Sequence, residues 1–155
     1  MNDIGRPLKT RIKRDIFRTY MSDTGILTHM LGDTAVKAVY TNDIGFNKGA
    51  LTENAVAEAL TKCGYVPTYY MKNSGDCRME IDFVVEMFDG IAAIEVKSGK
   101  TREAPSIGKV SQHFSIQRRM IFENGNIKRT DDGIEHYPLF ASAFFDELDN
   151  RPDYI

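Results

Sequence analysis

Two apolar segments joined by an Asp-Gly pair constrain the fold of this chain more than any other feature. The stretch MEIDFVVEMFDGIAAIEVKSGK, residues 79–100, reads as two strands joined at Asp89-Gly90, a dipeptide typical of tight β-hairpin turns. Three charged residues, Asp82, Glu95 and Lys97, interrupt these otherwise apolar strands. Because a buried ion is costly unless it is paired or coordinated, each of the three charges requires a partner.

The same hairpin predicts which face of the sheet carries the charges. With those two turn residues, Asp82 lies opposite Lys97, and Val84 lies opposite Glu95 on the neighbouring strand. Side chains alternate with a period of two, so the three charged residues are expected on one face, where both carboxylates can lean onto one ion. A change of one residue in the turn length would reverse this inference. The other face is expected to be apolar and to comprise Ile81, Phe83, Val85, Ile94 and Val96.

Two carboxylates and an ammonium on one strand pair suit a site for Mg²⁺ or Mn²⁺. Such cations take oxygen ligands, commonly one or two carboxylates together with water and substrate phosphate. The ion polarises a phosphodiester and acidifies a bound water, while a nearby lysine orients that water or stabilises charge on phosphorus. This predicts Asp82 and Glu95 as metal ligands, the Val96 carbonyl as a candidate third ligand, and Lys97 as a catalytic group. A plain salt bridge between Lys97 and Asp82 fits the same spacing.

The rest of the chain predicts an α/β fold with a central mixed sheet flanked by helices. A short strand, a turn at residues 22–25 and a helix ending at Gly32 are expected within residues 16–32. The clearest helix lies at residues 49–64, where an apolar stripe ends at a glycine. The further expected elements are strands within 65–73, 79–88, 90–99, 118–124 and 133–142, a helix within 104–117, and a short C-terminal helix.

The bulk composition fits one globular domain. The chain has 155 residues, of which 42% are hydrophobic and 27% are charged. Its two cysteines and three histidines are too few and too scattered for a zinc site or a disulfide framework. No segment reaches the roughly 20 apolar residues of a membrane span, and the N-terminal residues lack the apolar core of a signal peptide. We therefore expect a cytoplasmic protein that does not enter a membrane.

Charge is spread unevenly along the chain, although the formal net charge is only −2. The first 18 residues carry six basic and two acidic side chains. Such a run either faces phosphate or forms a solvated surface or linker. We predict residues 1–16 as a basic N-terminal segment or linker and residues 17–155 as the domain.

The charged residues of the hairpin also carry a family resemblance. Asp82, followed after twelve residues by Glu95-Val96-Lys97, resembles the D-x(n)-E-x-K core of the PD-(D/E)XK nuclease superfamily. More narrowly, the chain is similar to the C-terminal domain of unassigned function that follows the ATPase module in many prokaryotic AAA+ family proteins. The segments that carry this similarity are, in order, YMSDTGILTHMLG, GALTENAVAEAL, MEIDFVVE, AIEVKSGK and YPLFAS. The resemblance runs from about Phe17 to Phe145 and implies a restriction-endonuclease-like fold. It also implies metal binding at Asp82 and Glu95, and a catalytic role for Lys97.

The same family supplies one more acidic residue from the helix that precedes the sheet. The segment TENAVAEAL offers both Glu53 and Glu58, which flank the apolar stripe on opposite sides, so helical periodicity does not choose between them. The resemblance favours Glu53 as an accessory metal ligand. The alternative for Glu53 is a first-turn glutamate that interacts with the helix dipole.

These observations predict hydrolysis of phosphodiesters in nucleic acid, with DNA as the expected substrate and Mg²⁺ or Mn²⁺ as cofactor. The alternative is a non-catalytic nucleic-acid or protein-docking module of an ATPase. The GKT tripeptide at residues 99–101 lacks the upstream glycine of a phosphate-binding loop, because Ile94 stands at that position. Any ATPase module is therefore expected to act in trans or to have been lost by truncation.

Overall fold

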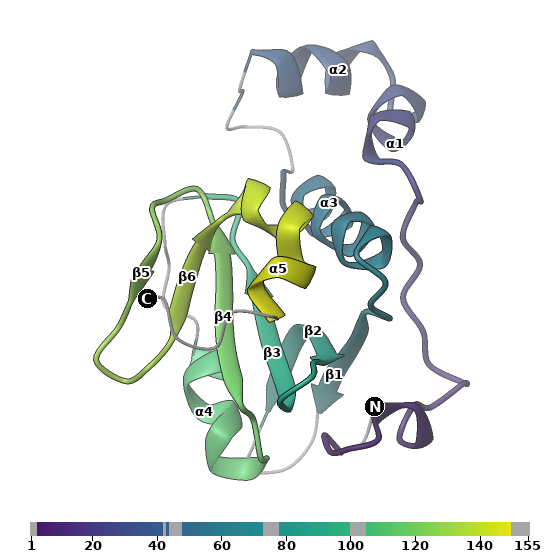
Figure 1. Cartoon of the computed structure of the whole chain (residues 1–155). Helices are drawn as coiled ribbons and strands as arrows, with labels where there is room; N and C mark the ends of the chain where they lie inside the picture. The colour runs from purple at the N-terminus through teal and green to yellow at the C-terminus, as the bar shows by residue number, and fades with distance from the viewer. Residues whose placement is uncertain (1–2, 42, 44–47, 73–77, 100–104, 150–155) are drawn as a thin grey trace.

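The computed structural model describes residues 3–41, 43, 48–72, 78–99 and 105–149, and within them the chain forms a mixed α/β fold (Figure 1). A six-stranded sheet runs through it in the order β1-β2-β3-β4-β6-β5. The strands are β1 (Thr68–Lys72), β2 (Met79–Glu86), β3 (Ile91–Val96), β4 (Arg118–Glu123), β5 (Lys128–Arg129) and β6 (Glu135–Pro138). The helices are α1 (Thr24–Met30), α2 (Asp33–Tyr40), α3 (Lys48–Lys62), α4 (Pro105–His113) and α5 (Phe145–Asp149), with 3-10 segments η1 (Leu8–Thr10) and η2 (Leu139–Phe144).

The sheet is mixed because two kinds of connection build it. Strands β1, β2 and β3 form an antiparallel meander, whereas β4 is parallel to β3 and β6 is parallel to β4. Helix α4 lies in the crossover between β3 and β4, as a parallel connection requires. The short strand β5 closes the far edge antiparallel to β6. The predicted α/β class with a central mixed sheet is therefore confirmed.

Side chains on the two faces of the sheet form two apolar clusters. One cluster packs α4, through Ile107 and Val110, against Val84 and Ala93 of the sheet. The other cluster packs α3, η2 and α5 against the opposite face, and in Figure 1 α3 and the η2–α5 segment lie side by side. Alternation along β3 sends Ala93 to the first cluster and Ile94 to the second. Within the described residues, no helix is long and apolar enough to cross a membrane.

The N-terminal residues contribute to the first cluster. Ile4 and Leu8 are buried in it, and Leu8 N donates a hydrogen bond to a Glu86 carboxylate oxygen at 2.9 Å. Arg6 Nε donates to the other oxygen of Glu86 at 3.1 Å. This part of the predicted basic segment is thus packed against the sheet, and the domain boundary at residue 16 stays a prediction.

The secondary structure differs from the prediction at one expected strand and at two elements that were not expected. The strand expected at the start of residues 16–32 does not form. The backbone there bonds to a side chain of α3 and not to a neighbouring strand, since Met21 N donates to Asn54 Oδ1 at 2.8 Å. Helix α2 and the two-residue strand β5 were not expected from the sequence. The helix expected within residues 49–64 is confirmed as α3, which ends at Lys62, two residues before Gly64, whose φ of 88° few other residues adopt.

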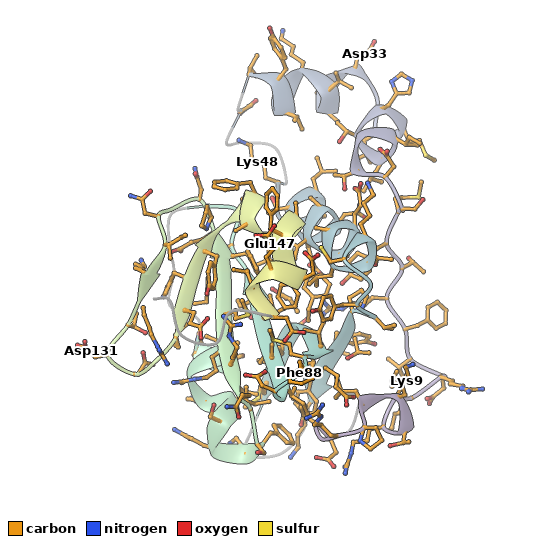
Figure 2. The ribbon with its side chains drawn as sticks, viewed as in Figure 1. Lys9, Asp33, Lys48, Phe88, Asp131 and Glu147 are labelled. Carbon is orange, nitrogen blue, oxygen red and sulfur yellow. The ribbon has the colours of Figure 1, made fainter. Side chains whose placement is uncertain are left out.

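The register of the central hairpin differs from the predicted one by two residues. Glu86 pairs with Ile91, and Met87 N donates to Gly90 O at 2.8 Å, so the turn is centred on Phe88 and Asp89. Gly90 is needed for close packing and not for the turn, because an added Cβ there would lie 2.6 Å from the Gln117 Cβ. Figure 2 labels Phe88, whose N–H donates to the Asp149 carboxylate at 3.0 Å.

This shift changes which charged residues face one another. Extending the observed pairs by one step places Asp82 opposite Glu95, so the predicted Asp82–Lys97 and Val84–Glu95 pairs are wrong. A shift of two residues keeps the parity, so Asp82 and Glu95 still share a side by the pairing rule. The predicted apolar face is also wrong at Ile81. An irregularity in the β1–β2 pairing places Ile81 in the α4 cluster, whereas Phe83 lies in the α3 cluster.

Candidate functional site

The candidate site lies where β2 and β3 stop pairing with each other. Phe83 and Ile94 form the last backbone pair, and beyond it Asp82 Oδ2 accepts a hydrogen bond from Val96 N at 2.9 Å. The Asp82 carboxylate therefore takes the place of a backbone acceptor at this end of the ladder. Val96 contributes its N–H to this contact, and the predicted role of its carbonyl as a third ligand stays a prediction.

Glu95 uses one of its two carboxylate oxygens and leaves the other unsatisfied. Oε1 accepts from Lys97 Nζ at 2.5 Å. Oε2 is the only buried side-chain nitrogen or oxygen in the described residues that lacks a hydrogen-bond partner. The Glu95 side chain is only 13% exposed, so it lies largely away from bulk solvent. A buried carboxylate oxygen without a donor is costly, and a cation would satisfy it.

Burial and a like charge together perturb Asp82. Burial raises the pKa of Asp82, and the negative charge of Glu95 raises it further, to about 7. The hydrogen bond from Val96 N opposes this rise, and Glu53 and Lys97 have smaller effects of opposite sign. A divalent cation stabilises an ionised carboxylate such as Asp82 that lies beside a second carboxylate. Carboxylate oxygens are also the donors that Mg²⁺ and Mn²⁺ prefer, so the residues fit such an ion.

Of the two candidate glutamates on α3, the structure brings Glu53 towards Asp82. The charge of Glu53 contributes to the raised pKa of Asp82. Glu58 instead links α1 to α3, because its carboxylate accepts hydrogen bonds from Thr24 N at 2.8 Å and from Thr24 Oγ1 at 2.7 Å. Lys62 also pairs with Glu58, one helical turn away.

Glu53 is held by two residues that the sequence did not single out. Its Oε1 accepts from Tyr20 OH at 2.6 Å and from Arg18 Nη1 at 3.0 Å. Arg18 also pairs with Glu80, and its guanidinium lies 4.6 Å from the centroid of the Tyr69 ring. Both residues come from a non-regular segment more than thirty positions before Glu53, so no periodic pattern in the sequence could reveal the contact.

In the described part of the chain, no group of three or more histidine, cysteine, aspartate or glutamate side chains is placed to hold a metal ion together. The acidic set at the site is accordingly the pair Asp82 and Glu95. Glu53 is close enough for its charge to reach Asp82, but it does not join the pair.

A second buried polar pair that the sequence did not reveal lies beside the site. Lys97 N donates to Phe122 O at 2.8 Å, which places Glu123 next to Lys97 across the parallel strands. Glu123 is buried, its Oε1 lies 2.8 Å from His136 Nδ1, and Lys128 Nζ lies 3.3 Å from the same oxygen. The charged groups thus continue across the carboxyl ends of β3 and β4.

The fold and the paired carboxylates define an α/β chain with a candidate acidic site at the end of a strand pair. Residues 48–140, which are more than half of the chain, match the family described as Domain of unknown function (DUF4143). The chain belongs to this family. The matched region includes Glu53, Asp82, Glu95 and Lys97. No curated protein and no solved structure matches the chain.

Proposed function

We propose that this chain is a metal-dependent nuclease domain that hydrolyses phosphodiester bonds in DNA. The observation that carries the proposal is the Asp82–Glu95 pair, with its unpartnered Glu95 Oε2, directly beside Lys97. In a salt-bridge network that only stabilises the fold, buried carboxylate oxygens are as a rule hydrogen-bonded. A hard cation that takes oxygen ligands accounts for both the pairing and the missing partner.

The order of elements supports the proposal. A helix, an antiparallel three-stranded meander, a crossover helix and a parallel strand follow one another as α3, β1, β2, β3, α4 and β4. This order agrees with the resemblance to the PD-(D/E)XK nucleases, whose acidic and lysine positions correspond to Asp82, Glu95 and Lys97. The expected site also lies outside the carboxyl end of β3, where ligands bind in many open α/β sheets.

Each residue then has a distinct role in the proposed reaction. Asp82 and Glu95 would hold Mg²⁺ or Mn²⁺, which when bound polarises the phosphodiester and lowers the pKa of a water. Lys97, 24% exposed and already beside Glu95, is placed to stabilise negative charge on the phosphoryl oxygens and to orient the attacking water. The hydrogen bond from Val96 N keeps one oxygen of Asp82 fixed and leaves the other oxygen for the ion.

A plasmid-nicking assay with Mn²⁺ or Mg²⁺ tests the proposal on the full chain. Wild type should convert supercoiled DNA to the nicked form only with metal, and Asp82→Asn should not cleave it. The matched control is Asp131→Asn, which changes an exposed aspartate at the opposite edge of the sheet from β1 (Figure 2) and should cleave like wild type. Failure of wild type to cleave any DNA, together with a melting temperature indifferent to both metals, would contradict the proposal and favour the docking module.

A further inference from the structure

An extended segment before α1 lies against α3 next to the candidate site. This segment, residues 17–21, is called the strap below. The Asn54 side chain of α3 makes two hydrogen bonds to the backbone of Met21, the last residue of the strap. Met21 N donates to Asn54 Oδ1 at 2.8 Å, and Asn54 Nδ2 donates to Met21 O at 3.1 Å. Asn54 is buried, so the strap is fixed to the helix at the turn that also carries Glu53.

Two strap side chains converge on a single oxygen of Glu53. Arg18 Nη1 and Tyr20 OH both donate to Oε1, at 3.0 and 2.6 Å. Burial raises the pKa of the Tyr20 hydroxyl, and the hydrogen bond to Glu53 raises it further, so Tyr20 stays a protonated donor. Two donors from the strap are therefore directed at the same Glu53 oxygen and hold this carboxylate against the strap.

Arg18 is itself held by three groups and not by Glu53 alone. Its second terminal nitrogen pairs with Glu80 of β2, and its guanidinium stacks over Tyr69 of β1 at 4.6 Å. The Arg18 side chain is 24% exposed, so these contacts are partly shielded from solvent. The planar guanidinium thus bridges α3 and the β1–β2 edge in one defined position.

We propose that Arg18 and Tyr20 are positioning residues that hold Glu53 outside the Asp82–Glu95 pair, so that the proposed metal site has two carboxylate ligands and not three. The inference rests on the proposed function, because it concerns the same ion. The strap lies before residue 48, where the family match begins. The matched region therefore includes Glu53 but not Arg18 and Tyr20, the residues that hold it.

Release of Glu53 should tighten metal binding for two reasons. Loss of the Arg18 charge removes a cation that neutralises Glu53 and would repel Mn²⁺. It also frees a third carboxylate whose charge already reaches Asp82. Because the affinity of oxygen-ligand sites depends on their count of charged ligands, we expect the Kd of Arg18→Gln for Mn²⁺ to fall about tenfold.

Mn²⁺ titration followed by electron paramagnetic resonance measures the Kd without any need for catalysis. Arg18→Gln should bind Mn²⁺ more tightly than wild type. The double variant Arg18→Gln/Glu53→Gln should have a Kd for Mn²⁺ equal to or higher than that of wild type. Tyr20→Phe removes one hydrogen bond to Glu53 and no charge, so it should tighten binding by a smaller factor. This variant also keeps the test decisive if Arg18→Gln does not fold. Arg11→Gln is the control, since Arg11 pairs with Asp3 in the N-terminal segment.

The outcomes separate the inference from the function on which it rests. If Arg18 has only a structural role, Arg18→Gln should have a lower melting temperature and an unchanged or higher Kd for Mn²⁺. That result, with wild type still binding Mn²⁺, would overturn the inference. If neither wild type nor any variant binds Mn²⁺, both the inference and the proposed function are refuted. Tightening in Arg18→Gln that persists in the double variant would show a pure charge effect, and it too would overturn the positioning of Glu53.

Discussion

Replacing Asp82 with asparagine should stabilise the chain at pH 8 when no divalent cation is present. Burial and the charge of Glu95 raise the pKa of Asp82 from 3.8 to about 7. The folded chain therefore binds a proton that the unfolded chain releases between about pH 4 and pH 7, so the free energy of unfolding falls as pH rises through that window. The full difference corresponds to about 4 kcal/mol, and asparagine, which does not ionise, avoids it.

The pH dependence separates this cause from ordinary packing effects. At pH 5 only part of the cost is present, so the gain of Asp82→Asn should be about 2–3 kcal/mol larger at pH 8 than at pH 5. The asparagine oxygen can still accept the hydrogen bond from Val96 N, which keeps the substitution nearly isosteric. Asp131→Asn, in an exposed loop, serves as the control and should change little at either pH.

Urea unfolding curves of the three proteins, followed by circular dichroism at both pH values, measure these differences. The same curves with Mn²⁺ test the link to metal. Wild type should gain about 1.4 kcal/mol at ten times Kd, and Asp82→Asn should gain nothing. Equal stability of wild type and Asp82→Asn at pH 8 would refute the reasoning, because it would mean that ionised Asp82 has no cost in the folded chain.

Two further substitutions test the site and the core. Lys97→Ala should keep or improve Mn²⁺ binding, since a neighbouring positive charge is lost, but should lower the rate of plasmid nicking by about 100-fold or more; an unchanged rate would remove Lys97 from the proposed mechanism. Leu60→Ala should lower the free energy of unfolding by about 2–5 kcal/mol in a denaturant titration, because Leu60 is fully buried between α3 and the sheet; a loss below about 1 kcal/mol would contradict the described packing.

The sequence predicted those elements whose patterns are local. The apolar stripe and the terminal glycine marked α3, and the apolar runs around Asp82 and Glu95 marked β2 and β3. The register was missed because Gly90 reads as a turn residue, whereas a distant neighbour, Gln117, requires it for close packing. Ile81 was assigned to the wrong face for a similar reason, since the irregular pairing with β1 has no sequence signature.

The proximity of the candidate site residues was predictable for the same reason, because it depends on a local pattern. Asp82 and Glu95 lie on neighbouring strands of one hairpin and Lys97 directly follows the second strand, so their proximity survives a register error of two residues. The hold of Arg18 and Tyr20 on Glu53 depends on how a non-regular segment crosses α3, which only the tertiary structure reveals. The same holds for Glu123 and His136, which meet across two strands joined by a long connection.

The central claim is that Asp82 and Glu95 bind one divalent cation. Its most direct test is a crystal of the chain grown or soaked with Mn²⁺, examined by anomalous diffraction at the manganese edge. We expect one strong anomalous peak about 2.1 Å from an oxygen of each carboxylate, with Glu95 Oε2 among the ligands. A well-ordered site without a peak at a Mn²⁺ concentration that supports nicking, or a peak bound elsewhere, would contradict it.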